Sequence, residues 1–539
     1  MPEYDYLIAG GGIAGLYTAY RLNKKFPSAR ICILESADRL GGRLHTIHQD
    51  NMYFDAGGAR FNTDQHRILK LVSQLGLNNK KIAIQSDNRY IPEMPDYELT
   101  LSNIFPSFDD FIKDAIEYIK THNISKSTLE NITILEFAKR YYLKKYPTID
   151  KYILARYPYY SEIAILNAKE GFNLFTNEFS PQSKYYILAG GLEQLITRII
   201  TYLKKSPHIQ IMTNTPLESI TQNDGNGDII YTIYTTPGKI LSADKLILAL
   251  PQNALLKIKY LLRPGKFNLS RMLRSVSSQP LYRIYARYPL NKKTRKPWFA
   301  DLPKITTNLP IKYIIPMDYE KGLIMISYTD SKWAEWWFNH LEKGTLSAEL
   351  SRQLKILFPE LEIPEPIWFK HCYWDMGAAY WRPGFNRESI MRDIIKPYPD
   401  EELYICGENY SSHQAWVEGS LETADMVLEH IMRVGNGKGK GKSEDNTRKR
   451  TKKQIAGGVK IKLPEYTLEE VGKHNKKADA WIVIDGIVAN ITKWIPLHPG
   501  GDVIMKGVGK DATQLFHSIG HDAAAKKMLR KYQIGVLKK

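Results

Sequence analysis

The chain has 539 residues, of which 43% are hydrophobic and 11% aromatic, so it is long enough to form two or three folded cores. Its 75 Lys and Arg residues exceed its 57 Asp and Glu residues, and the net charge of +18 favours acidic partners such as nucleic acid or an anionic surface. A coding genome rich in A and T would explain the many lysines equally well. Three cysteines without a CxxC pair exclude a disulfide framework and a structural zinc site.

The first residues enter a strand and lack the basic and apolar segments of a secretory signal. No apolar run approaches the length that crosses a bilayer, and the C-terminal residues lack a hydrophobic anchor. Together with the few cysteines, these features predict a soluble protein with no transmembrane segment, located in the cytoplasm or another intracellular, reducing compartment.

The start of the chain has the pattern of a strand, a glycine-rich turn, a helix and a second strand. Gly10, Gly12 and Gly15 form a GxGxxG motif that also contains Ala14. The first glycine permits the tight turn, the second lets a pyrophosphate approach the backbone, and the third lets the helix pack on the strand. Glu35 ends the second strand, where a carboxylate binds ribose hydroxyls. The pattern predicts a dinucleotide site at the helix N-terminus.

With this motif and several later segments, the chain resembles the flavin-containing amine oxidase family over residues 4–433. The resemblance implies further cofactor-binding positions: Gly42 and Arg43 in a second glycine turn, Gly58 and Ala59 in DAGGARF, Leu217 in TNTPLESI, and Glu408 in LYICGENY. LAGGLEQLITRI and ADKLILALP are similar to two more elements of the family. The expected fold class is an α/β Rossmann-like FAD-binding domain with an α+β substrate domain.

The resemblance also implies how residues 1–433 are divided. FAD-binding segments are expected at about 1–99, 185–253 and 400–433, and helical or substrate-binding segments at about 100–184 and 254–399. Residues from about 100 to 180 are rich in Tyr, Lys and Ile at helical spacing, which predicts helices there.

Three residues bear on the substrate. Arg60 stands where L-amino-acid oxidases carry an arginine for the substrate carboxylate, a task that suits a bidentate guanidinium. Trp416 falls where amino-acid oxidases also have tryptophan, and Tyr380 is expected to form the other aromatic wall. Alternatively, Arg60 binds flavin phosphate or a neighbouring carboxylate, and Tyr380 is a core residue.

Two positions depart from the family pattern. Ala379 replaces the cysteine that attaches flavin in covalent members, which implies that FAD is bound non-covalently. Arg283 aligns with the family lysine that holds a water against flavin N5, but a guanidinium is bulkier and permanently charged. Either the reaction of the flavin with oxygen is altered, or the alignment of Arg283 with this lysine is displaced by a few residues.

Residues 434–461 lack periodicity and have little apolar content, which predicts a basic flexible linker. Its run from Arg448 to Lys453 is either a solvated spacer or a patch for nuclear import or nucleic-acid binding, and nuclear import would place the protein in the nucleus.

Residues 462–539 resemble the cytochrome b5 domain, a small α+β fold that binds haem b, through YTLEEVGKHN, WIPLHPGG and HSIGH. The resemblance implies that His498 and His521 are the two iron ligands, with His517 as the alternative to His521. With both axial positions filled, the haem would carry electrons and bind no substrate.

These features predict FAD-dependent oxidation of an amino compound, with an L-amino acid favoured and catalytic positions at Arg60, Arg283, Tyr380 and Trp416. Electrons would pass to the fused haem, to a redox protein or to oxygen. One alternative is a C–C desaturase on the same fold. The other is a structural or nucleic-acid-associated flavohaemoprotein with little turnover, since a fold alone does not fix a function.

Overall fold

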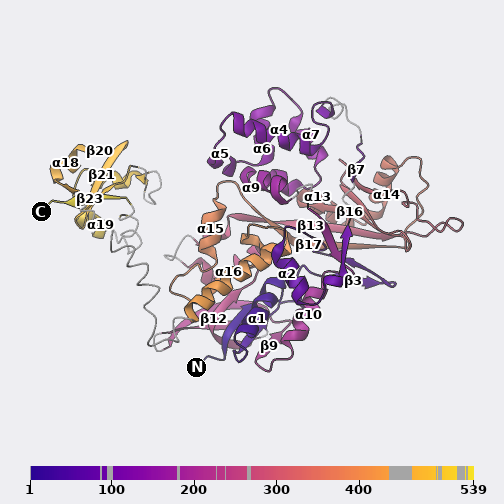
Figure 1. Cartoon of the computed structure of the whole chain (residues 1–539), viewed down its shortest axis with the longest axis horizontal. Helices are drawn as coiled ribbons and strands as arrows, with labels where there is room; N and C mark the ends of the chain where they lie inside the picture. The colour runs from indigo at the N-terminus through magenta and orange to yellow at the C-terminus, as the bar shows by residue number, and fades with distance from the viewer. Residues whose placement is uncertain are drawn as a thin grey trace. The chain divides into compact units, whose positions relative to one another are not determined.

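The computed structural model describes residues 2–84, 88–93, 101–178, 183–225, 228–236, 238–263, 269–435, 464–492, 494–495, 501–518, 529 and 532–538. The chain forms two compact units, Met1–Gly439 and Lys440–Lys539, and each is considered by itself (Figure 1). Within the described ranges, no helix is long and apolar enough to cross a membrane.

A seven-stranded sheet forms the centre of the nucleotide-binding part of the first unit. Its parallel strands are β9 (Ile209–Met212), β2 (Ile31–Leu34), β1 (Tyr4–Ala9), β12 (Ile240–Leu248) and β18 (Leu403–Ile405). An antiparallel hairpin, β10 (Leu217–Gly225) and β11 (Asp228–Thr235), continues the sheet beyond β12. All four residues of β2 are buried, as expected for a parallel strand covered on both faces.

Three helices cover one face of this sheet: α1 (Ile13–Lys25), α10 (Gln194–Leu203) and α16 (Val417–Gly435) (Figure 1). They bury apolar residues such as Leu16, Ile199 and Leu421 against Ile8 and Ile33 of the central strands. The three helices come from distant parts of the sequence, so the expected α/β Rossmann-like fold is confirmed as an assembly of separate segments.

A second, mostly antiparallel sheet forms the substrate part, in the order β17 (Trp368–Trp381), β13 (Val276–Arg287), β16 (Leu323–Asp330), β15 (Tyr313–Asp318), β14 (Lys304–Thr306) and β7 (Asn88–Tyr90). Helices α13 (Ser331–Glu342) and α14 (Leu346–Leu357) pack on it. Strand β7 lies in the range that we assigned to FAD binding, yet it pairs with β14. Such a long-range pairing has no signal in the local sequence.

The predicted helices form a bundle with its own apolar core (Figure 1). They are α4 (Phe108–Thr121), α5 (Lys126–Glu130), α6 (Ile134–Tyr142), α7 (Ile149–Arg156), α8 (Tyr160–Ala164) and α9 (Ala168–Asn173). Capping boxes begin two of them, because Ser107 and Thr133 accept backbone N–H groups that the first turn leaves unpaired. The bundle contributes α8 to the cavity described below.

The second unit contains a five-stranded sheet in the order β19 (Glu465–Tyr466), β23 (Gln533–Leu537), β22 (Ile487–Asn490), β21 (Asp479–Ile484) and β20 (Asn475–Lys476). Helices α18 (Leu468–Lys473) and α19 (Thr513–Ser518) accompany it. The α+β class predicted for this unit is therefore confirmed, and Phe516 of α19 belongs to its apolar core.

Asp55, the last residue of β4 (Met52–Asp55), links the hairpin of β3 (Thr46–Gln49) and β4 and the segment before α10 to strand β13 of the second sheet. Its Oδ1 accepts hydrogen bonds from the Thr46 hydroxyl (2.6 Å) and the Leu192 amide (3.1 Å). Its carbonyl oxygen accepts from Arg283 Nη1 (2.8 Å) and the Tyr285 hydroxyl (2.7 Å), both on β13. Burial raises the pKa of the Asp55 carboxyl to about 6, against partial compensation by the Thr46 hydrogen bond.

We expect Asp55→Asn to change the pH dependence of stability. Because the pKa rises from 3.8 to about 6, the folded protein keeps a proton that the unfolded chain loses between these values. The contribution of the Asp55 carboxyl to the free energy of unfolding is therefore fully present below about pH 4, and it falls by about 3 kcal/mol as the pH rises through 6. Asparagine keeps the oxygen that accepts both hydrogen bonds but does not titrate. As the pH rises from 4 through 6, the free energy of unfolding of the variant should therefore increase by about 3 kcal/mol relative to that of wild type. Calorimetric unfolding of both proteins checks this, and a constant difference across the window would contradict it.

Candidate functional site

A single cavity of about 790 Å³ in the first unit collects nearly all the predicted site residues. Its lining includes the predicted cofactor positions Gly10, Gly12, Ala14, Glu35, Gly42, Arg43, Gly58, Ala59, Leu217 and Glu408. It also includes the predicted substrate positions Arg60, Arg283, Tyr380 and Trp416. Gly15 does not line the cavity and has the packing role expected of it.

The turn between β1 and α1 forms one end of the cavity. Gly10 has a φ of +111°, which a residue with a side chain rarely adopts. A Cβ on Gly15 would lie 2.0 Å from the Gly10 carbonyl oxygen, whereas a Cβ on Gly12 would meet no atom within 4 Å. Helix α1 has neither a side-chain cap nor an acidic residue in its first turn. Its first N–H groups therefore face an open space that suits an anionic phosphate.

Glu35 and Leu217 lie beyond this turn on the same cavity wall. The Glu35 carboxylate accepts hydrogen bonds from the backbone of Gly11 (2.8 Å) and Ala37 (2.8 Å), which fix its position after β2. Leu217 begins β10, next to an irregularity in the pairing of β10 with β11. This end therefore offers a fixed carboxylate and strand backbone, the groups that bind a ribose and a base edge.

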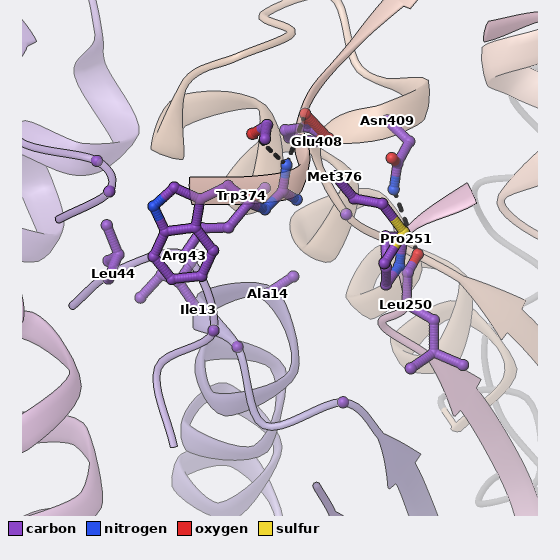
Figure 2. Close-up of a pocket in the computed structure, with 18 of the residues that line it drawn as sticks. Ile13, Ala14, Arg43, Leu44, Leu250, Pro251, Trp374, Met376, Glu408 and Asn409 are labelled. Carbon is purple, nitrogen blue, oxygen red and sulfur yellow. Dashed lines mark hydrogen bonds and ion pairs between the residues drawn. The ribbon is translucent and has the colours of Figure 1, made fainter. Parts of the chain in front are cut away.

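Glu408 and Arg43 lie further along the cavity (Figure 2). Glu408 Oε1 accepts from Arg43 Nη1 (3.0 Å) and from the Ala379 amide (2.9 Å), and Arg43 Nη1 also donates to the Gly377 carbonyl (2.9 Å). Glu408 Oε2 is buried without a hydrogen-bond partner among the described residues. A buried carboxylate oxygen is costly without a donor, so a ligand with hydroxyl or N–H groups fits this position.

Arg60 lies in the loop between β4 and β5 (Phe61–Asn62), where it lines the cavity beside aromatic rings. Its guanidinium carbon lies 5.3 Å from the Tyr185 ring centre and 5.7 Å from that of Trp416. Burial lowers the pKa of Arg60, but nearby tyrosines, Tyr159 and Tyr313 first, outweigh this and raise it. Among the described residues no carboxylate forms an ion pair with Arg60, so its charge is available to an anionic ligand.

Arg283 lies on the same cavity wall but is bound to the protein itself. It is 8% exposed, donates to the Asp55 carbonyl, and lies 4.4 Å from the centre of the Tyr328 ring. Burial lowers its pKa and Tyr328 raises it, with a net increase, so the residue stays charged. Its alignment with the family lysine and its chemical role both stay predictions.

The cavity also contains residues that the sequence did not reveal, among them Tyr159, Glu162 and Tyr328. The first two come from the start of α8 and the third from β16. They belong to no motif and meet the family loops only through tertiary packing. Tyr380, which was predicted, is 5% exposed at the end of β17, and burial raises its pKa well above the usual value.

The position of Ala379 agrees with non-covalent FAD. Ala379 is buried, and its amide is bound to Glu408. The three cysteines, Cys32, Cys372 and Cys406, are buried elsewhere, and none is among the residues that line the cavity. No thiol of the described chain is therefore available there for a thioether link.

The predicted haem ligands His498 and His521 lie outside the described residues, as does the basic run Arg448 to Lys453. The alternative ligand His517 is described: its Nε2 lies 2.8 Å from Asp485 Oδ1, on a side chain that is 44% exposed. This contact occupies one of the two ring nitrogens through which a histidine can bind a metal.

Comparison with known proteins identifies both units. Residues 13–427 match the flavin containing amine oxidoreductase family, and residues 467–538 match the cytochrome b5-like haem/steroid binding domain. An uncharacterised protein of Acanthamoeba polyphaga mimivirus is 22% identical over 484 residues, which are 79% of this chain and 93% of that protein. Cytochrome b5 of Oryza sativa subsp. japonica is 49% identical over 71 residues, 13% of this chain and 52% of that protein.

A solved structure of a putrescine oxidase variant redesigned for cofactor binding covers 80% of this chain and 99% of its own. Its TM-score is 0.59 and its identity 17%, so it shows a shared fold. The chain is an FAD-dependent oxidoreductase fused to a haem domain. It belongs to the flavin containing amine oxidoreductase family, with FAD as the cofactor of the first unit and haem as that of the second.

Two glycine variants should separate FAD binding from folding. Gly12→Val places a side chain into the open space before α1 at an ordinary φ of −77°, so the fold should persist while FAD affinity falls about 100-fold or more. Gly15→Val is the matched control, because its Cβ would collide with the Gly10 carbonyl and should destabilise the unit itself. Titration of the apoprotein with FAD and circular dichroism measure the two effects. Unchanged FAD affinity in Gly12→Val would refute this placement.

Proposed function

We propose that the protein oxidises the amine of an L-amino acid with FAD and passes the electrons to its own haem. The observation that carries the amino-acid assignment is Arg60, a charged guanidinium in the cavity with aromatic neighbours and no carboxylate partner in the described chain. A guanidinium in such an environment binds a carboxylate strongly, because both groups are withdrawn from water.

The side chains around the cavity would orient the substrate. Arg60 binds its carboxylate, and Tyr380 and Trp416 flank its amine, which holds the α-carbon at one distance from the cofactor. FAD, when bound, accepts the hydride from this carbon. We assign no general base, because an amine that arrives neutral needs none, and the imine product hydrolyses in water.

The haem supports a route for the electrons. If residues 434–461 form the flexible linker that the sequence predicts, the haem domain has an effective concentration near its partner of about millimolar, which competes with dissolved oxygen even when docking is weak. Arg283 supports the same conclusion, since a guanidinium bound to Asp55 and Tyr328 does not act as the compact, titratable charge expected of the family lysine.

The desaturase alternative uses the same fold and would release no ammonia from its substrate. Neither the described residues nor the comparisons add support for nucleic-acid binding, and the basic run that suggested it lies outside the described residues.

Arg60→Ala should lower kcat/KM for an L-amino acid by about tenfold or more, mainly through KM, because a charge-assisted pair is lost. The matched amine without the carboxylate should lose far less. Arg60→Lys is the second variant. It keeps the charge but removes the bidentate geometry, so its kcat/KM for the L-amino acid should lie between those of wild type and Arg60→Ala. Steady-state kinetics with ammonia release as the readout measures this. Equal losses for both substrates would assign Arg60 to the cofactor or the fold.

Removal of residues 434–539 should leave the cofactor's reduction by substrate intact and slow its reoxidation by external acceptors. Anaerobic stopped-flow absorbance of the full chain should show flavin bleaching followed by the bands of reduced haem. If substrate never reduces the haem, and the shortened protein forms peroxide as fast as the full chain, the haem has no part in the electron path.

A further inference from the structure

Trp416, whose ring lies beside Arg60, stands at the end of a loop that connects two helical segments. This loop, residues 411–416, runs from the short helix η4 (Glu408–Tyr410) to the start of α16. Its residue Ala415 has a φ of +66°, which residues with a side chain rarely adopt. Because such a conformation is strained, contacts with the surrounding structure must hold it.

Glu422, on the second turn of α16, supplies such contacts. Its Oε2 accepts a hydrogen bond from the Ser412 amide (2.8 Å), and its Oε1 accepts one from the Ser412 hydroxyl (2.6 Å). His413 Nδ1 lies 3.4 Å from the same Oε2. Burial raises the pKa of Glu422, but the hydrogen bonds of His413 and Ser412 outweigh this and lower it. Both oxygens of a charged carboxylate therefore hold the 411–416 loop.

The same loop is bound to the other aromatic wall of the cavity. Gln414 Oε1 accepts a hydrogen bond from the Trp381 amide (2.8 Å), and Gln414 Nε2 donates to the Asn409 carbonyl (2.5 Å). Trp381 is the last residue of β17 and directly follows Tyr380. The 411–416 loop thus connects the strand of Tyr380 to Trp416.

The first turn of α16 prevents the loop from moving closer to the helix. A Cβ on Gly419 would lie 2.2 Å from Ser411 Oγ and 2.3 Å from the His413 carbonyl oxygen, so the loop already touches the helix backbone. The loop can relax only away from α16, and this is the direction that the hydrogen bonds of Glu422 oppose.

We infer that Glu422 is a positioning residue that keeps Trp416 beside Arg60 by holding the 411–416 loop through Ser412. Resting on the proposed function, this makes Glu422 a determinant of substrate binding, although it is not among the residues that line the cavity. Without its carboxylate, the strained backbone at Ala415 relaxes and the Trp416 ring leaves the wall. Arg60 then loses a ring that lies 5.7 Å from its guanidinium carbon.

The direct test measures the surroundings of Trp416 in the holoenzyme. The near-UV circular dichroism of a protein minus that of its Trp416→Phe version isolates the signal of Trp416. Glu422→Ala should reduce this signal to about half or less of its wild-type value, because the signal depends on fixed packing. Glu422→Gln keeps an acceptor for the Ser412 amide and a polar group for its hydroxyl, so it should retain most of the signal. An unchanged signal in Glu422→Ala would overturn the inference.

Asp425→Ala is the matched control. Asp425 lies about one turn further along α16, and its Oδ1 accepts hydrogen bonds from Tyr17 (3.0 Å) and Arg21 (2.9 Å) of α1. Its removal weakens the anchoring of the same helix to α1, and the Trp416 signal should stay at the wild-type value. An equal loss of signal in Asp425→Ala and Glu422→Ala would mean that Glu422 acts only through the fold.

Ser412→Ala tests the same contact if Glu422→Ala does not fold. It removes the hydroxyl that donates to Glu422 Oε1 and keeps the amide that donates to Oε2. The Trp416 signal should therefore fall, but by less than in Glu422→Ala. A signal equal to that of wild type would contradict the role of this contact.

A double-mutant cycle gives the kinetic counterpart. Glu422→Ala should raise KM for an L-amino acid about fivefold, with a smaller change in kcat, and should have little further effect in a Trp416→Phe background. The same rise in KM in both backgrounds would assign Glu422 to the fold alone. If wild type oxidises no amino acid, the proposed function fails, and the circular dichroism of Trp416 still decides the role of Glu422.

Discussion

The hydrogen bond from Arg283 to the Asp55 carbonyl is the contact on which the geometry of the first unit depends. It joins β13 of the substrate sheet to the end of β4, immediately before the loop that carries Gly58, Ala59 and Arg60. The Asp55 side chain holds the same point from the other side, through Thr46 and Leu192. A shift of β13 relative to β4 would therefore move the loop of Arg60 relative to the second sheet.

This junction also shows how a buried arginine is accommodated in the cavity wall. A buried guanidinium needs several acceptors, and Arg283 finds a carbonyl oxygen and the face of Tyr328. The residue thereby becomes a structural cation with a fixed charge. Arg60, by contrast, has rings around it and no carboxylate partner in the described chain, so the two arginines of one cavity differ in the partners that the protein gives them.

The sequence predicted the cofactor end well and the substrate end in part. Gly10, Gly12 and Glu35 belong to one continuous strand–turn–helix–strand segment, so their spacing alone determines their geometry. Glu162 and Tyr328 come from separate elements, and only the packing of the helical bundle on the second sheet brings them to the cavity. Strand β7 escaped prediction for the same reason. Its three residues carry no pattern, and its partner lies more than two hundred residues away in the chain.

The charges of the cavity constrain the chemistry more tightly than the fold does. Amine oxidation needs a neutral nitrogen, which a cation at the carboxylate end favours and a carboxylate close to the nitrogen opposes. Arg60 supplies such a cation, and its guanidinium lies beside the Tyr185 and Trp416 rings. The fold would accept many amines and several kinds of dehydrogenation. Under the proposed function, Arg60 selects among them, because a substrate without a carboxylate leaves this guanidinium with no charge partner among the described residues.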